Sequence, residues 1–130
     1  MSSWDAYKIV LSVDSNIHLE FPESFHKKIQ VLALISAESH FNTGVIGDDG
    51  RSLGLMQVQW KYHKNIPKDK LRLDTSTNIK TGIACLKAVN WDVQAYNAGV
   101  RGARHGRGKN HKKKVYNETR RIFQWLTNNK

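Results

Sequence analysis

Ile29-Gln30-Val31-Leu32-Ala33-Leu34-Ile35-Ser36-Ala37-Glu38 is the most apolar stretch of the chain, and it ends in a carboxylic acid. At helical spacing Val31, Leu34 and Ile35 share one face. Glu38 extends that face by one more turn, so the pattern predicts a buried helix with an acid on its buried side. Burial disfavours the charged form of a carboxyl group and raises its pKa, which keeps a proton donor available near neutral pH. The alternative is a glutamate at a fraying helix end that turns out to solvent.

Apolar periodicity and turn residues predict further helices on both sides of this stretch. Pro22 is typical of a first helical turn, and it starts a helix that ends near His40. The other predicted helices cover residues 4–13, closed by the polar residues 14–16, then a segment along 79–89 with N-cap candidates at 75–77, then 91–99 and 115–126. Residues 67–74 are expected to form a polar connection. No alternating strand pattern exceeds a few residues, so the fold class is mainly α.

The composition indicates one soluble globular domain over residues 1–130. The chain is 39% hydrophobic and 25% charged, and no apolar run approaches the ~20 residues that span a membrane. The first residues lack a basic region followed by an apolar one, so we expect no signal peptide. The one cysteine, Cys85, excludes an internal disulfide and is expected in the core.

Neither a metal nor a cofactor is expected. The six histidines show no close pair with the spacing of zinc ligands. We expect His40 and His63 to border a cleft and the remaining four to lie on the surface, namely His18, His26, His105 and His111.

The net charge of +10 predicts an anionic partner, such as nucleic acid, a membrane surface or an acidic polymer of the bacterial cell wall. The charge is concentrated between Arg101 and Lys114, a segment without any acidic residue. This segment also lacks the aromatic residues on which single-stranded nucleic acids stack. We therefore rank attraction to anionic wall polymers first, a solvated loop second and a nucleic-acid-binding module third.

Four short stretches occur in a suggestive order: Glu38-Ser39-His40-Phe41-Asn42, Gly54-Leu55-Met56-Gln57-Val58, Asn78-Ile79-Lys80-Thr81-Gly82 and Ala95-Tyr96-Asn97-Ala98-Gly99. Together they resemble the soluble lytic transglycosylase domain, the lysozyme-like fold of glycoside hydrolase family 23 that goose-type lysozymes share. The resemblance covers about residues 29–126. It implies an enzyme that binds peptidoglycan glycan strands and cleaves them between N-acetylmuramic acid and N-acetylglucosamine.

The resemblance also implies roles for individual residues in the first two stretches. Glu38 matches the sole catalytic acid and base, and Ser39 matches a neighbour that contacts the sugar. Met56 and Gln57 match the segment that lines the sugar cleft.

The later stretches supply the opposite side of the expected cleft. Tyr96, Asn97 and Ala98 match a segment that faces the acid, where the tyrosine can hydrogen-bond it and backbone groups bind N-acetyl arms. Tyr116 matches a further cleft tyrosine from the last helix.

The chain departs from the transglycosylase pattern after Gln57. Gln59-Trp60-Lys61-Tyr62-His63-Lys64 lacks the proline that transglycosylases often carry there, and it looks more like goose-type lysozyme. Those lysozymes hold the attacking water with acids whose positions match Asp48 and Gln59, and Gln59 is not acidic. Asp48 is therefore either a water-holding residue of a hydrolase or a solvated turn aspartate.

Together these observations favour a monomeric lytic transglycosylase that forms 1,6-anhydromuramic ends, with hydrolysis assisted by Asp48 as the alternative. A wall-degrading enzyme without a signal peptide resembles the bacteriophage lysis enzymes called endolysins. Such an enzyme accumulates in the host cytoplasm before its release to the wall, and a virion-associated enzyme is the second option.

Overall fold

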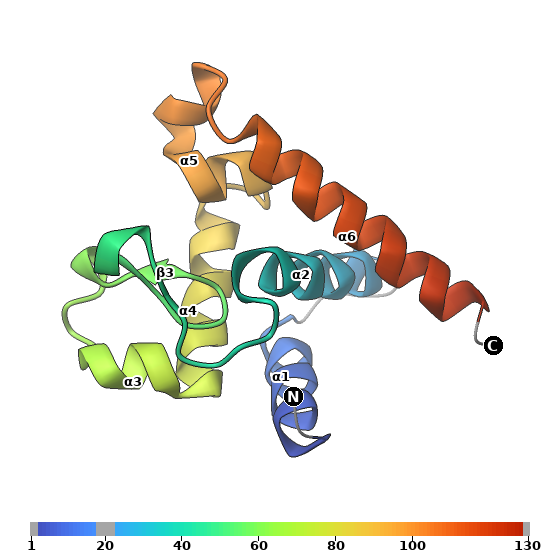
Figure 1. The fold of residues 1–130 in the computed structure, drawn as a ribbon, viewed down its shortest axis with the longest axis horizontal. Helices are drawn as coiled ribbons and strands as arrows, with labels where there is room; N and C mark the ends of the chain where they lie inside the picture. The colour runs from blue at the N-terminus through green and yellow to red at the C-terminus, as the bar shows by residue number, and fades with distance from the viewer. Residues whose placement is uncertain (1–2, 18–22, 129–130) are drawn as a thin grey trace.

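Helix α2 (Glu23–Ser39) contains the apolar stretch and runs through the middle of the molecule (Figure 1). The computed structural model describes residues 3–17 and 23–128, so the expectations for Pro22 and His18 lie outside the described residues. Val31, Leu34 and Ile35 are completely buried, as the periodicity predicts. Burial of each such side chain contributes about 1.5–3 kcal/mol to folding, which explains why this helix is central.

The other helices confirm the mainly α fold class and correct several predicted bounds. They are α1 (Ser3–Asn16), α3 (Lys68–Leu73), α4 (Thr75–Ala88), α5 (Val93–Arg104) and α6 (Lys109–Asn128). The polar residues expected to close α1 belong to its last turn, and α3 forms where a polar connection was expected. The N-cap of α4 is Asp74, whose carboxylate accepts the backbone N–H of Thr77 at 2.8 Å. This bond lowers the pKa of Asp74.

A small antiparallel sheet follows α2. Its strands are β1 (Ile46–Gly47), β2 (Ser52–Leu53) and β3 (Val58–Gln59), in that spatial order. Leu53 pairs with Ile46 on one side and with Val58 on the other. Short 3₁₀ turns, η1 (Asp48–Gly50) and η2 (Trp60–Tyr62), lie beside the strands. Strands of two residues are too short to show an alternating pattern, so the sequence did not predict the sheet.

Asn78 joins this sheet to α4. It is 1% exposed, and its side-chain carbonyl accepts the backbone N–H of Met56 at 2.9 Å. Its amide group donates to the carbonyls of Leu53 at 2.8 Å and Leu71 at 2.9 Å. One turn later, Gly82 leaves room for Met56, because a Cβ there would lie 2.4 Å from the methionine sulfur.

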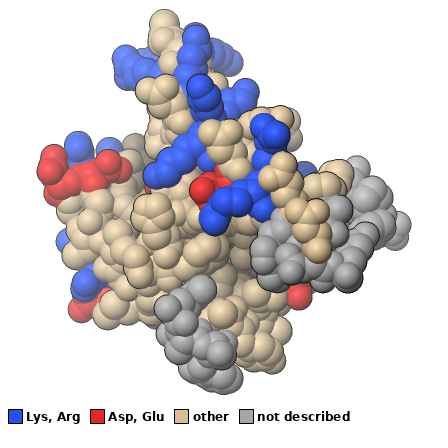
Figure 2. All heavy atoms as spheres, turned by 45° about the vertical axis from the view of Figure 1, so that its right-hand side comes forward, with Lys and Arg blue, Asp and Glu red and all other residues tan. Residues whose placement is uncertain are grey.

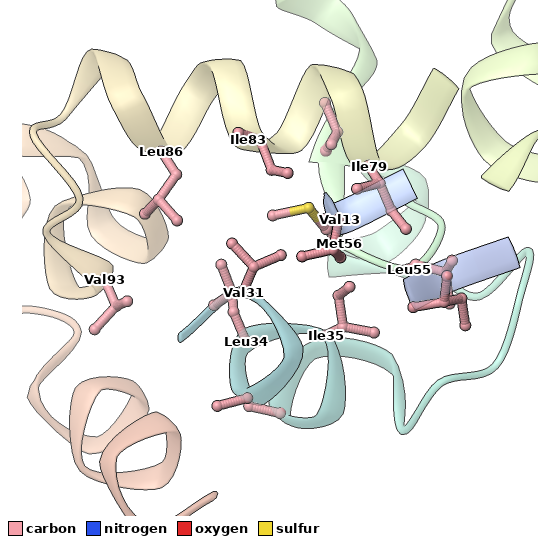
Figure 3. Packing of buried hydrophobic residues seen from close by; sticks show 14 of the residues in the cluster. Val13, Val31, Leu34, Ile35, Leu55, Met56, Ile79, Ile83, Leu86 and Val93 are labelled. Atoms are coloured by element: carbon pink, nitrogen blue, oxygen red, sulfur yellow. The ribbon is translucent and has the colours of Figure 1, made fainter. Parts of the chain in front are cut away.

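Met56 therefore packs between α4 and α2. Figure 3 shows it between Ile79 and Ile83 on one side and Ile35 on the other. Two of the four sequence stretches thus meet in the core, and this contact fixes the sheet relative to α2. Within residues 3–17 and 23–128, no helix is both long and apolar enough to cross a membrane.

Candidate active site

A cleft of about 410 Å³ opens between the C-terminal end of α2, the sheet, η2, α4 and the first half of α5. Glu38 and Asp48 are the carboxylates among the described residues that line it. Its other polar lining includes Gln57, His63 and Asn97. The cleft is the right kind of space for an extended polar ligand, because it is concave and has converging polar groups.

Glu38 lies on the last turn of α2 with its side chain only 13% exposed. The Nε2 atom of His111, from the first turns of α6, lies 3.0 Å from its Oε1 atom. This distance is that of an ion pair, yet the ring nitrogen has no hydrogen-bond partner with correct geometry. We take the 3.0 Å distance between the two atoms as the sign of an interaction, because a small rotation of the imidazole would align the hydrogen bond without moving the helix. His111, expected on the surface, is instead 14% exposed and contacts the acid.

Tyr96 lines the cleft from α5. The expected hydrogen bond from Tyr96 to Glu38 is absent. The Tyr96 hydroxyl donates its one proton to the backbone carbonyl of Met56 at 2.6 Å. Burial raises the pKa of Tyr96 well above its ordinary value, and the negative charge of Glu38 adds to this shift. Tyr96 is therefore a fixed neutral wall of the cleft whose proton is already bound.

Ser39 and Met56 are not on the cleft surface, which contradicts the expectation for both. Ser39 is 2% exposed, and its hydroxyl donates to the carbonyl of Ile35 at 3.0 Å. Met56 is 0% exposed because its side chain fills the core against Gly82. Both side chains are buried beneath the cleft-forming segments that carry them.

Gln57, Asn97 and Ala98 do line the cleft, as expected. Gln57 has a φ of 50°, and its amide donates to the carbonyls of Val45 at 3.1 Å and Gly54 at 2.9 Å. These bonds hold a backbone conformation that residues other than glycine rarely adopt.

Tyr116 is 61% exposed and does not line the cleft, so the structure does not bring it together with the other candidate site residues. Residues of α6 that contact α2 include His111, Lys114 and Glu118. Lys114 donates to the carbonyl of Ala37 at 3.0 Å, which places a cation at the negative end of α2. Helical spacing would have put His111 on this face, but the sequence predicted a helix only from residue 115.

Asp48 occupies the sheet side of the cleft. It is exposed, has a φ of 51°, and accepts the hydroxyl of Ser52 at 2.6 Å. Gln59 lines the same side. Asp48 therefore lies in the cleft wall, and one of its carboxylate oxygens accepts a hydrogen bond. Both alternatives from the sequence, a water-holding residue and a solvated turn aspartate, stay open.

Cys85 lines the cleft, half-buried, rather than the core. Its sulfur lies 3.4 Å from Nε2 of His63, which lines the cleft as expected. Burial raises the pKa of the Cys85 thiol, so this is not the environment of a reactive thiolate. His40 is exposed and does not line the cleft, contrary to its prediction. Among the described residues, no three His, Cys, Asp or Glu side chains are grouped as metal ligands.

The basic segment between Arg101 and Lys114 is mostly helical, which argues against the second-ranked alternative of a solvated loop. It comprises the end of α5, a turn, and the start of α6. The side-chain amide of Gln94 holds this turn by donating to the carbonyls of Ala103 at 3.2 Å and Arg107 at 2.8 Å. Figure 2 shows Lys and Arg side chains gathered on the upper part of one face, where α5 and the start of α6 lie.

The comparisons with known proteins give one match. A family model described as the transglycosylase SLT domain matches residues 24–120. No curated protein and no solved structure matches the chain. The matched residues include all of α2 except its first residue, the sheet, α4, α5 and the part of α6 that carries His111.

Proposed function

The chain belongs to the transglycosylase SLT domain family, and on this premise we propose that it cleaves the β-1,4 bond between N-acetylmuramic acid and N-acetylglucosamine with Glu38 as both acid and base. Members of this family are peptidoglycan lytic transglycosylases, and this chain is an enzyme of that class with a lysozyme-like fold. We propose the role of Glu38 and the 1,6-anhydromuramic product of the reaction.

The position of Glu38 is the observation that supports the proposal. It is a mostly buried carboxyl group that still borders the cleft, at the end of an apolar helix. Glycoside cleavage requires a protonated carboxyl group beside the leaving oxygen. Glu38 lies on the last turn of α2 and lines the same cleft as Asn97 and Ala98, so it is placed to serve as that group.

Two proton transfers complete the reaction. Glu38 first donates its proton to the oxygen that leaves with N-acetylglucosamine, as the bond from that oxygen to C1 of N-acetylmuramic acid breaks. The N-acetyl group of the same sugar stabilises the positive charge at C1. The Glu38 carboxylate then removes the proton of the 6-hydroxyl, whose oxygen bonds to C1 and closes a 1,6-anhydro ring. The proton returns to Glu38, so the cycle needs neither water nor a second carboxylate.

Hydrolysis is the second candidate, and the position of Asp48 favours it. An inverting glycosidase holds water with a base roughly 6.5–9.5 Å from the acid. Asp48 lines the same cleft as Glu38, but one of its oxygens already accepts the Ser52 hydroxyl. We therefore place transglycosylation first.

The basic face supports a role in finding the substrate. We propose that residues 101–114 attract the enzyme to anionic polymers of the cell wall or envelope, because their charges gather on one face beside the cleft-forming α5. A monomeric phage lysis enzyme, held in the host cytoplasm until release, fits this combination, and a virion-associated enzyme is its variant.

The test is the clearing of purified cell walls by the wild type and by Glu38→Gln. General acid–base catalysis contributes about 100- to 10,000-fold, so the Gln variant should lose at least 99% of the rate while its fold is kept. Asp48→Asn is the matched control, and we expect it to clear walls at nearly the wild-type rate. A Gln variant that retains a third of the rate would remove Glu38 from the mechanism.

A further inference from the structure

We propose that His111 is a positioning residue, whose imidazole holds the Glu38 carboxyl group in the cleft from the α6 side. The proposal rests on the proposed function of Glu38 and extends it to a residue that no expectation placed near the site.

Glu38 needs such a partner because Tyr96, the residue expected to hydrogen-bond it, and the adjacent Ser39 are both engaged elsewhere. The Tyr96 hydroxyl donates to the Met56 carbonyl, and the Ser39 hydroxyl donates to the Ile35 carbonyl. A glutamate side chain has three rotatable torsions, and catalysis requires its carboxyl group within about 0.5 Å of the productive position. In the described part of the chain, His111 is the one basic group within 4.0 Å of the Glu38 carboxylate.

His111 is itself placed rigidly. Its helix packs along α2, and the contact is held by the hydrogen bond of Ser36 to Glu118 at 2.8 Å and by the Lys114 bond to Ala37. Val115 of the same helix is buried in the core. The turn before α6 is tied to α5 by the Gln94 amide. The imidazole therefore reaches Glu38 from a fixed helix, and its side chain is only 14% exposed.

The ring nitrogen also lacks an alternative partner. Among the buried polar side-chain atoms of residues 3–17 and 23–128, only Nε2 of His111 and the Ser12 hydroxyl have no aligned hydrogen bond. An unsatisfied buried polar group destabilises the fold by about 1–3 kcal/mol. Nε2 lies 3.0 Å from Oε1 of Glu38, so a small rotation of the ring would give the nitrogen a hydrogen bond to this carboxyl group. Stability alone would favour an apolar residue here, which points to a role in the site.

The surrounding charges show why this role suits an imidazole. Lys114 already places a permanent cation on the last turn of α2, and Tyr96 faces the acid as a neutral phenol. A second permanent cation in contact with Glu38 would oppose its protonated form, which the reaction requires. An imidazole can accept or donate a hydrogen bond without a permanent charge.

The first test uses steady-state kinetics on a soluble, uncross-linked glycan strand. His111→Ala should lower kcat about 10- to 100-fold, since a displacement of about 1 Å in a catalytic group has effects of that size. KM should change little, because His111 does not line the cleft. His111→Gln offers an amide N–H at similar reach and should recover most of the loss.

The matched control is His26→Ala, which removes an exposed histidine from the opposite end of α2. It should leave both kcat and KM unchanged. Equal kcat values for the wild type and His111→Ala would overturn the positioning role. A well-folded His111→Gln variant with the same loss as His111→Ala would overturn it as well.

The second test observes the contact without any reaction. In ¹H–¹⁵N spectra of the imidazole rings at fixed pH, Glu38→Gln should shift the His111 signals, and Asp48→Asn should not. Unchanged His111 signals in Glu38→Gln would show that the contact is absent and overturn the proposal. A wild type that releases no glycan products would refute the proposed function, and with it any positioning role, even if the spectra show the contact.

Discussion

Replacement of Asn78 by leucine tests whether the sheet is held in place from α4. The side chain is nearly isosteric, so the change removes three buried hydrogen bonds without opening a large cavity. It leaves the Met56 N–H without its acceptor and the carbonyls of Leu53 and Leu71 without this donor. Each unsatisfied buried group destabilises the fold by about 1–3 kcal/mol, and carbonyls lie at the lower end, so we expect a loss of about 3–5 kcal/mol. That is a large part of the 5–15 kcal/mol typical of whole domains.

The assay is urea unfolding followed by circular dichroism, with Asn117→Leu as the matched control. Asn117 is exposed on α6, so the same substitution there should change the free energy of unfolding by no more than about 0.5 kcal/mol. Asn78→Leu should also reduce wall clearing in conditions where it remains folded, because Met56 supports Tyr96 through its carbonyl. A loss below 1 kcal/mol, with a normal unfolding slope, would refute the role of Asn78 as the junction between the sheet and α4.

Two further predictions concern charged residues of α6. Lys112 and Lys113 are exposed. Their joint replacement by glutamine should slow the clearing of whole walls and flatten its salt dependence, because salt screens the attraction between these cations and an anionic wall over about 8–10 Å. Equal losses on walls and on short soluble glycans would argue against long-range attraction. The hydrogen bond from Arg121, with a second from Ser36, holds the pKa of Glu118 below its ordinary value against the opposing effect of partial burial. The wild type should therefore be more stable than Glu118→Gln by about 1 kcal/mol above about pH 5. This difference should disappear as the pH falls below about 4.3, the pKa of an unfolded glutamate, and then through the lower pKa of the folded state. A difference that persists at pH 2 in urea unfolding would contradict these hydrogen bonds to the Glu118 carboxylate.

The sequence predicts best what depends on long apolar periodicity. The run that ends at Glu38 predicted a buried helix with the acid on its buried side, and α2 carries Glu38 there, at the border of the cleft. The order of the four stretches also identified the side of the cleft that carries Asn97 and Ala98.

The wrong prediction for Met56 arises because its side chain and its backbone lie on different sides of the structure. Met56 belongs to a cleft-forming stretch, but its side chain fills the core while its carbonyl binds Tyr96. A sequence pattern identifies such a residue without showing which of its groups faces the cleft.

His111 was missed for another reason. The first turns of α6 consist of polar and basic residues, so apolar periodicity begins only at Val115. In the structure α6 begins at Lys109 and packs against α2, and this brings the histidine to Glu38.

Mass spectrometry of digested peptidoglycan tests the central claim most directly, because a 1,6-anhydro end is one water lighter than a reducing end. If Glu38 acts alone as acid and base, the wild type should release mainly 1,6-anhydromuramic ends, and Asp48→Asn should release the same products. Predominantly reducing ends that are lost in Asp48→Asn would contradict the account, and would show that Asp48 holds the water of a hydrolase.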